Sequence, residues 1–292
     1  MRKNNLAICI FALPALLLFT VFVVYPMIPQ VIMSFENYDG LSSSGFVGFN
    51  NYAQVLSSDS FWISCGNTWI IVFISVFIAI PISLLFALLM DYEKCNFVKN
   101  VFKIGAVFPA IISVVVIAQM WVAIYEPQWG LINSFLKTIG LGGLARSWLT
   151  DKSTVVVCIS IAYLWQYIGL NTLILYTGIK SIPHTYHEAA KLDGAGFWKS
   201  SFKITIPLLS DVFQYVLILS TLGSLAEFAH IRVMTAGGPG YMSRSMIYEM
   251  YYNAFSRSDY GMGSAVAVLF IIQCLIVTFV INKLLHKEAV QF

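Results

Sequence analysis

Two groups of polar residues lie inside otherwise apolar stretches, and their spacing places each group on one face of a helix. The first group recurs at intervals of three and four and comprises Ser160, Tyr163, Tyr167 and Asn171. The second has similar spacing and comprises Ser220, Ser224 and Glu227, with Gly223 beside it. Lipid offers such groups no hydrogen-bond partner, so we expect both faces to meet protein or a water-filled path. The residues predicted to line a path for a polar solute are Tyr163, Tyr167, Asn171, Ser220, Ser224 and Glu227.

Plain helix packing is the alternative for part of this set. Ser220, Gly223 and Ser224 suit close helix contact as well as they suit a solute path. Tyr163, Tyr167 and Asn171 are too bulky for close contact and favour the path. Glu227 lies near the outer end of its segment, where a snorkelling residue or a gate residue is also expected.

Sequence motifs for catalysis, nucleotide binding and metal binding are absent. No Gly-Lys-Ser/Thr tripeptide provides a phosphate loop, and no Gly-x-Ser-x-Gly elbow is present. His187-Glu188 is followed by Lys191 where a zinc protease helix needs a second histidine. The five cysteines show no Cys-x-x-Cys spacing, and the four histidines fall at predicted membrane edges, where solvated side chains are expected. We therefore predict neither an enzyme nor a cofactor or metal.

A polar, helix-prone segment from His187 to Leu209 interrupts the apolar sequence. Glu188 to Leu192 are good helix formers, Pro183 fits the approach to a helix start, and either Gly194 or Gly196 can end a short helix. The segment predicts about two turns of exposed helix. Such a projection suits a socket on another protein, although an ordinary interfacial loop helix has the same pattern.

The composition is that of a membrane protein. Of 292 residues, 59% are hydrophobic and 11% are charged, against about 25% charged in an average soluble domain. A net charge of +3 without a dense basic cluster argues against nucleic-acid binding. We predict an all-α integral membrane protein, a single domain over residues 1–292 with a cytoplasmic loop 181–206 between its fourth and fifth helices. The six expected spans are residues 6–34, 67–90, 104–125, 154–179, 208–229 and 262–283. The fifth requires Asp211 and Glu227 to be accepted near its ends.

The basic residues predict the orientation. With the N-terminus inside, eleven of the seventeen Lys and Arg residues lie on the cytoplasmic side although the outer loops are longer. Those eleven are Arg2, Lys3, Lys94, Lys99, Lys103, Lys180, Lys191, Lys199, Lys203, Lys283 and Lys287. The positive-inside rule then places both termini and the His187 loop in the cytoplasm, in a multi-pass protein of the plasma or inner membrane.

Three blocks resemble a known family. The first is Glu188-Ala189-Ala190, three residues, Gly194, nine residues, then Ile204-Thr205-Ile206-Pro207. The second is Thr235-Ala236-Gly237-Gly238-Pro239, then Tyr251-Tyr252-Asn253-Ala254-Phe255 and Gly261-Met262-Gly263-Ser264-Ala265, and a looser third is Phe46 to Tyr52. The first block resembles the "EAA" loop of permease subunits from binding-protein-dependent ABC importers. Together the blocks resemble the carbohydrate branch, similar to the first permease of the maltose and glycerol-phosphate systems.

The resemblance implies a function and partners. In that family the EAA loop is a cytoplasmic coupling helix seated in a cleft of the ATPase. The residues implied in coupling are Glu188, Ala189, Ala190, Asp193, Gly194, Ile204 and Pro207. The implied partners are a second homologous permease, ABC ATPase subunits, an extracytoplasmic solute-binding protein docking near Thr235–Phe255, and a carbohydrate substrate. Aromatic rings with amides and hydroxyls suit such a substrate, because a sugar has apolar ring faces and many hydroxyls.

Two other classes of function remain to be compared. A self-contained secondary transporter or channel would need coupling carboxylates near the midplane, whereas Asp211 and Glu227 fall near opposite ends of one span. No inverted repeat is visible. A membrane-embedded enzyme is disfavoured by the missing paired acids, metal cluster and nucleophile motif.

Overall fold

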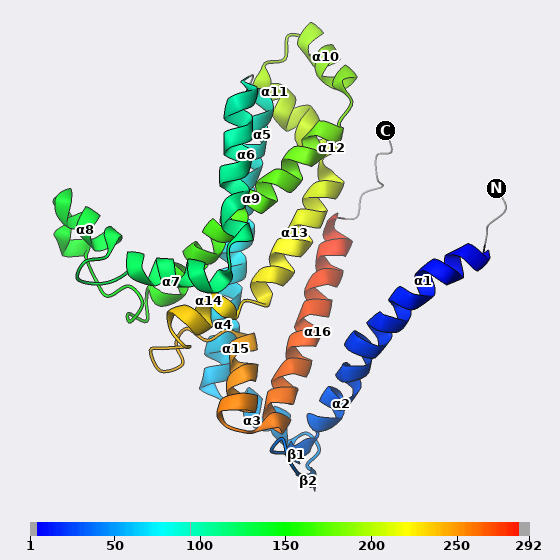
Figure 1. Cartoon of the computed structure of the whole chain (residues 1–292), viewed down its shortest axis with the longest axis vertical. Helices are drawn as coiled ribbons and strands as arrows, with labels where there is room; N and C mark the ends of the chain where they lie inside the picture. The colour runs from blue at the N-terminus through cyan, green and yellow to red at the C-terminus, as the bar shows by residue number, and fades with distance from the viewer. Residues whose placement is uncertain (1–4, 94, 286–292) are drawn as a thin grey trace. The chain divides into compact units, whose positions relative to one another are not determined.

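The computed structural model describes residues 5–93 and 95–285, and almost all of its regular structure is helical (Figure 1). The predicted all-α class is confirmed; one short antiparallel ribbon, β1 (Glu36–Tyr38) with β2 (Ser43–Phe46), is the exception among the described residues. The chain forms two compact units, Met1–Phe61 with Glu249–Ile272, and Trp62–Tyr248 with Gln273–Phe292.

The first unit begins with a long apolar helix. It runs through α1 (Asn5–Phe19), a π-helical turn (Thr20–Val24) and α2 (Tyr25–Met33), and Phe11–Met33 is long and apolar enough to cross a membrane. No part of that span is buried within the chain, as expected where lipid is the solvent. The unit also contains β1, β2, α3 (Asn50–Leu56), the π-helical turn Tyr252–Ser256 and the start of α16 (Tyr260–Leu285).

The segment Phe46–Tyr52, noted in the sequence, folds back on the end of α2. Buried Asn51 donates from Nδ2 to the carbonyl oxygens of Ser34 and Glu36, both at 2.9 Å. The hydroxyls of Ser34 and Tyr52 lie 2.7 Å apart. Gly261 is needed beside this joint, because a Cβ there would lie 2.3 Å from the Glu36 carbonyl oxygen. These contacts hold the end of α2 against the start of α16.

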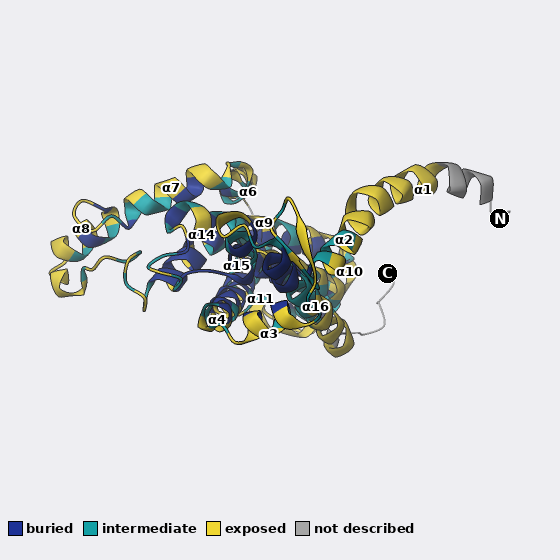
Figure 2. Ribbon diagram, turned by 90° about the horizontal axis from the view of Figure 1, so that it is seen from below, coloured by how far each residue is buried: buried dark blue, intermediate teal, exposed yellow. Residues whose placement is uncertain are grey.

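The second unit is organised around α9 (Val155–Ser181), which is largely buried and contacts α5 (Ile80–Tyr92), α6 (Asn96–Ile111) and α13 (Ser210–Leu225) (Figure 2). Its core includes Ile80 and Leu88 of α5, Leu175 and Ile179 of α9, and Val216 of α13. The remaining helices of the chain are α4 (Asp59–Ile74), η2 (Ser75–Ala79), α7 (Val114–Ile124), α8 (Leu131–Thr138), α10 (His184–Leu192), α11 (Phe197–Ser200), α12 (Ile206–Leu208), α14 (Ala229–Met234) and α15 (Met246–Tyr251), with short turns at Gly142–Leu144 and Ser201–Thr205.

Helices long enough to span a membrane are Phe11–Met33, Asp59–Tyr92, Val155–Ser181, Ser210–Met234 and Tyr260–Leu284 within the described residues. The predicted span 104–125 is not one continuous helix. It divides into α6 and α7, bent by 98°, because Ile112 and Ser113 both take extended backbone angles (ψ 145° and 131°). The apolar sequence continues through these two residues, so hydropathy predicted one helix where the structure has two.

Candidate functional site

The loop between α9 and α13 carries the first candidate site, the helix α10. Pro183, in extended conformation (ψ 135°), precedes the helix, which starts at His184. Gly194 ends it: φ is +71°, and the amide of Ala195 donates to the Ala190 carbonyl oxygen at 2.9 Å. Gly196 has an ordinary negative φ of −72° and leads into α11 instead. Of the two glycines left open by the sequence, Gly194 is therefore the terminator.

Most of the residues implied in coupling face outward from this loop. Glu188, Ala189, Asp193, Gly194 and Pro207 are exposed. Ala190 is buried and Ile204 half-buried, so these two face the rest of the unit. In the described part of the chain the carboxylates of Glu188 and Asp193 form no ion pair.

Aromatic and polar contacts connect this loop to the membrane helices. The ring of Phe197 in α11 lies 4.6 Å, centroid to centroid, from that of Tyr92 at the end of α5. Nδ1 of His187 lies 3.3 Å from the Ser200 hydroxyl, which links α10 to α11. α10 is thus linked to α11, and α11 packs against the end of α5.

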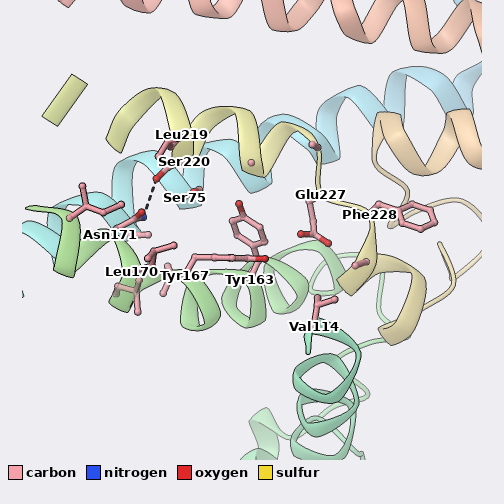
Figure 3. A pocket seen from close by; sticks show the side chains of 17 residues that line it. Ser75, Val114, Tyr163, Tyr167, Leu170, Asn171, Leu219, Ser220, Glu227 and Phe228 are labelled. Carbon is pink, nitrogen blue, oxygen red and sulfur yellow. Dashed lines mark hydrogen bonds between the residues drawn. The ribbon is translucent and has the colours of Figure 1, made fainter. Parts of the chain in front are cut away.

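The second candidate site is a cavity of about 450 Å³ between α9 and α13, closed by η2 and by the start of α14 (Figure 3). Its polar groups form a row from Asn171 and Ser220 at one end, through Tyr167 and Tyr163, to Glu227 at the other. Nδ2 of Asn171 donates to Oγ of Ser220 at 3.0 Å, which joins the two spans. Apolar residues, among them Leu170 and Leu219, complete the wall.

Five of the six predicted path residues therefore meet in one cavity, and Ser224 is not among its lining. The Ser224 hydroxyl is fully buried and donates to the carbonyl oxygens of Ser220 and Thr221 at 2.7 and 3.0 Å. Ser160 lies on the other predicted face, and its hydroxyl likewise donates to a carbonyl oxygen of its own helix, that of Val156, at 2.7 Å. A Ser hydroxyl inside a membrane helix finds its acceptor one turn back, which periodicity alone does not reveal.

Ser75 is a lining residue that the sequence analysis missed. It is the first residue of the π-helical turn η2, which forms a third side of the cavity and contributes the Ser75 hydroxyl to it. The available signal was a single serine inside a long apolar run, Ile70 to Ile82, with proline at position 81.

Glu227 is buried rather than snorkelling at the membrane edge. Its side chain is 6% exposed, and its Oε1 accepts the backbone N–H of His230 at 2.7 Å. The Nδ1 atom of His230 lies 3.1 Å from the same oxygen, and the His230 side chain has no exposed surface. The expectation of a solvated His230 was wrong, because this histidine packs edge-on against the ring of Tyr163, 5.8 Å between centroids.

The Thr235–Pro239 block is an ordered turn in the second unit. Thr235 and Ser243 hydroxyls lie 2.8 Å apart, and the Ser243 hydroxyl donates to the Gly238 carbonyl oxygen at 2.6 Å. From α4, Nδ2 of Asn67 donates to the carbonyl oxygens of Met242 and Arg244 at 2.8 and 3.0 Å. The loop that follows the block is thereby fixed to a membrane helix.

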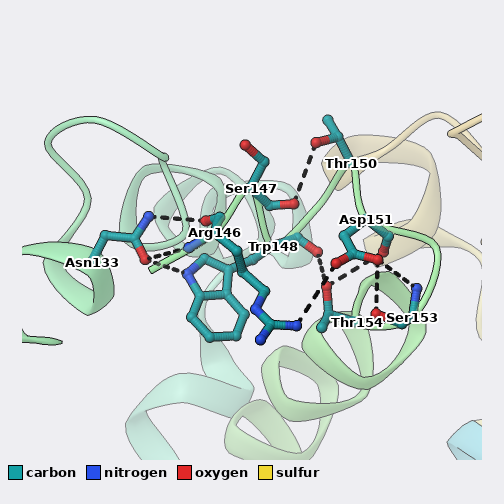
Figure 4. Close-up of polar contacts among 8 residues, drawn as sticks. All are labelled: Asn133, Arg146, Ser147, Trp148, Thr150, Asp151, Ser153 and Thr154. Atoms are coloured by element: carbon teal, nitrogen blue, oxygen red, sulfur yellow. Dashed lines mark hydrogen bonds and ion pairs between the residues drawn. The ribbon is translucent and has the colours of Figure 1, made fainter. Parts of the chain in front are cut away.

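A further ordered segment, which the sequence did not single out, lies between α7 and α9 (Figure 4). Asn133 of α8, 1% exposed, donates to the carbonyl oxygens of Pro127 and Arg146 at 3.0 and 2.9 Å. Its Oδ1 accepts from Nε1 of Trp148 at 2.8 Å.

Asp151 accepts from the amide and hydroxyl of Ser153 at 2.9 and 2.7 Å. These bonds lower the pKa of the Asp151 carboxyl, the Ser153 amide contributing most.

Comparisons with known proteins agree with this geometry. Residues 66–290 match the family described as binding-protein-dependent transport system inner membrane component. A probable ABC transporter permease of Pyrococcus horikoshii is 33% identical over 271 residues, 92% of each chain. The trehalose/maltose transport system permease MalF of Thermococcus litoralis is 32% identical over 272 residues, 93% of this chain and 90% of its own. The fold matches a chain in the crystal structure of a bacterial ABC transporter involved in alginate import, with a TM-score of 0.85, 21% identity, and 97% and 96% of the two chains covered.

Proposed function

The chain belongs to the family of binding-protein-dependent transport system inner membrane components, and we propose that it forms half of the path for a sugar or related polyol in an ABC importer. As a permease it is a transport subunit and not an enzyme. The observation that carries the proposal is the cavity between α9 and α13, with its row of phenol, amide, hydroxyl and carboxylate groups. The names of relatives that transport sugars point to the same substrate class.

The cavity offers the two kinds of contact that a sugar needs. The rings of Tyr163 and Tyr167, 4.8 Å apart, present aromatic faces on which a pyranose can stack. Ser220, Asn171 and Glu227 supply acceptors for hydroxyl groups, and Asn171 also donates. Solute arriving from outside would occupy this row, and movement of α9 relative to α13 would open it inward.

Two serines on α13 give a matched test of this assignment. Ser220 lines the cavity, whereas Ser224 is buried and bonded to its own helix. In the assembled importer, Ser220→Ala and Tyr167→Ala are expected to raise the solute concentration for half-maximal transport about tenfold, the effect of one or two lost hydrogen bonds or stacking contacts. Ser224→Ala should leave it unchanged. Equal effects of the two serine variants would contradict the path assignment.

The exposed helix α10 is the proposed coupling element. Its outward carboxylates, Glu188 and Asp193, would meet basic groups of a separate ATPase subunit, and Gly194 would let the backbone turn within the socket. A tag on the C-terminal tail allows a pull-down from native membranes. An ATP-binding subunit should accompany the unaltered chain and be lost with the Glu188→Arg, Gly194→Trp double variant; retention by the variant would overturn the assignment.

The remaining proposed partners are a second, homologous permease that completes the path and a solute-binding protein that docks outside, near Thr235–Phe255. The family description, binding-protein-dependent, supports the latter, and the pinned turn at Thr235–Pro239 offers an ordered docking surface. Retention of the binding protein by vesicles, with and without a charge reversal at Arg232, would test that surface.

We further propose that both termini and α10 are cytoplasmic. The basic residues Arg2, Lys3, Lys94 and Lys287 that support this lie outside the described residues. Cys95, exposed between α5 and α6, is a native reporter on the same side. A membrane-impermeant maleimide should label it in inside-out vesicles and not in intact cells, with Cys95→Ser as the control. Labelling from outside would reverse the orientation.

A further inference from the structure

Glu227 is the only charged residue among the described residues that line the cavity. The others are serine, tyrosine, asparagine, glycine and apolar residues, and no lysine, arginine or histidine is among them. His230 lies next to Glu227, yet it is fully buried and does not reach the cavity wall. Whatever enters the cavity therefore meets a carboxylate, and none of the described residues that line the cavity with it carries a basic side chain.

The contacts of Glu227 occupy one of its two carboxylate oxygens and leave the other to the cavity. Oε1 accepts the His230 backbone N–H at 2.7 Å and lies 3.1 Å from Nδ1 of the same residue. Oε2 has no hydrogen-bond partner among the described residues. Because the Glu227 side chain lines the cavity, this oxygen can accept a hydrogen bond from a solute (Figure 3).

We propose that Glu227 makes this cavity select neutral or amino-bearing sugars and reject acidic ones, such as uronates and sugar phosphates. This inference rests on the proposed solute path and specifies its substrate class. A hydroxyl or ammonium group of the solute donates to Oε2 in a charge-assisted hydrogen bond. A solute carboxylate or phosphate instead meets a like charge at the cavity wall, and the described lining residues include no basic side chain to compensate it.

His230 is a positioning residue in this arrangement. Its ring lies between Glu227 and Tyr163, at 3.1 Å from the carboxylate and edge-on to the phenol ring. It thereby contacts both groups and is not part of the cavity lining.

The test measures the electrostatic potential of the cavity in the assembled importer in membrane vesicles, without knowledge of the transported solute. Ala226 is exposed in the cavity lining next to Glu227, and Leu219 lines it two turns earlier on α13. A cysteine is placed at either position, and its reaction rates with a cationic and an anionic methanethiosulfonate of similar size are compared. The unaltered chain, with its native cysteines, provides the background.

At Ala226→Cys the cationic reagent is expected to react faster, beyond the intrinsic ratio of the two reagents, by about tenfold or more. Glu227→Gln, which keeps Oε1 as an acceptor for the His230 amide, should remove most of that preference. Asp211→Asn, an exposed carboxylate on the same helix outside the lining, should not. The preference should also weaken with added salt and be smaller at Leu219→Cys.

The outcomes separate this proposal from the one on which it rests. A rate ratio in the Ala226→Cys chain no larger than the intrinsic ratio of the two reagents, or a preference that survives Glu227→Gln, would overturn charge selection and leave the solute path standing. If Glu227→Gln fails to fold, the salt dependence of the cationic preference in the Glu227-containing chain is the test: a preference that does not weaken with added salt would overturn charge selection. Failure of both reagents at both cysteines would show that the cavity is not a water-filled path, and would overturn both proposals.

Discussion

Gly169 of α9 lies directly against the backbone of Ala106 in α6: a Cβ at Gly169 would fall 1.6 Å from the Ala106 carbonyl oxygen. The two helices thus meet backbone to backbone, with no side chain between them. Small residues allow such an approach between membrane helices, and the gain is van der Waals packing rather than hydrophobic burial. This contact positions the face of α9 that carries Tyr163, Tyr167 and Asn171.

Gly169→Ala is expected to destabilise the protein by about 1–3 kcal/mol, because the added methyl group forces backbone apart rather than a side chain aside. The unfolding temperature of the purified importer in detergent would fall by several degrees. Gly105→Ala is the matched control, since position 105 is helical and no atom lies within 4 Å of a Cβ there. Equal melting temperatures for the two variants would contradict the close contact.

Gly194→Ala is expected to impair coupling through the backbone alone. No atom lies within 4 Å of a Cβ at this position, but φ is +71°, and a left-handed residue with a side chain costs about 1–2 kcal/mol. We expect transported solute per ATP hydrolysed to fall severalfold, with Gly194→Asn less affected because asparagine tolerates this conformation. Gly196→Ala, at a φ of −72° and also in open space, should be neutral.

Asn133→Ala is expected to loosen the segment between α7 and α9. The change removes a donor and an acceptor and leaves Nε1 of Trp148 without its bond, at a cost of about 1–3 kcal/mol. Hydrogen exchange of residues 127–148 should accelerate, while that of α9 stays unchanged. Ser134→Ala, on the exposed side of the same helix, is the control. Unaltered exchange in Asn133→Ala would show that Asn133 does not hold the segment.

Asp151 should give this segment an acid-dependent stability. The Ser153 amide, followed by the Ser153 hydroxyl, lowers the pKa of the Asp151 carboxyl below its ordinary value of 3.8. A pKa that is lower in the folded state contributes stability above the unfolded value, and this contribution is lost as the pH falls through the folded value. Protection of the Ser153 amide, corrected for intrinsic exchange, should decline with acid below about pH 4. Asp151→Asn should abolish that dependence.

The loop of Asp39 provides an internal control for the acid experiment. The amides of Ser42 and Leu41 donate to Asp39 at 2.7 and 2.9 Å and lower its pKa in the same way, the Ser42 amide contributing most. Its acid dependence should persist in Asp151→Asn. Loss of protection at both loops in that variant would indicate a global effect rather than the local one predicted.

The family and the helical class followed from the sequence because both rest on local features. The Glu188-Ala189-Ala190 block has a fixed spacing, and lipid requires long apolar helices in every span. The resemblance to binding-protein-dependent permeases is confirmed by the family match and by relatives over nearly the whole chain. The roles of the coupling and path residues stay predictions.

Other details depend on contacts that no local pattern contains. Ser220 and Ser224 have the same periodicity, but the Ser220 hydroxyl accepts from Asn171 of α9, whereas the Ser224 hydroxyl donates to its own helix. The position of His230 in the sequence predicted a solvated side chain at the membrane edge. In the structure His230 belongs to the short helix α14 and is buried next to Glu227. Asn133 was not singled out because its partners, Pro127 and Trp148, are brought together by tertiary folding.

The right-angle break after Ile111 has a consequence for the surrounding bilayer. If the membrane-crossing part of this segment is α6 alone, its 16 residues extend about 24 Å, against a hydrocarbon core of about 30 Å. Such hydrophobic mismatch is relieved by thinning the bilayer beside the helix. Val114, the first residue of α7, lines the cavity, so the thinned part of the bilayer would lie beside that cavity.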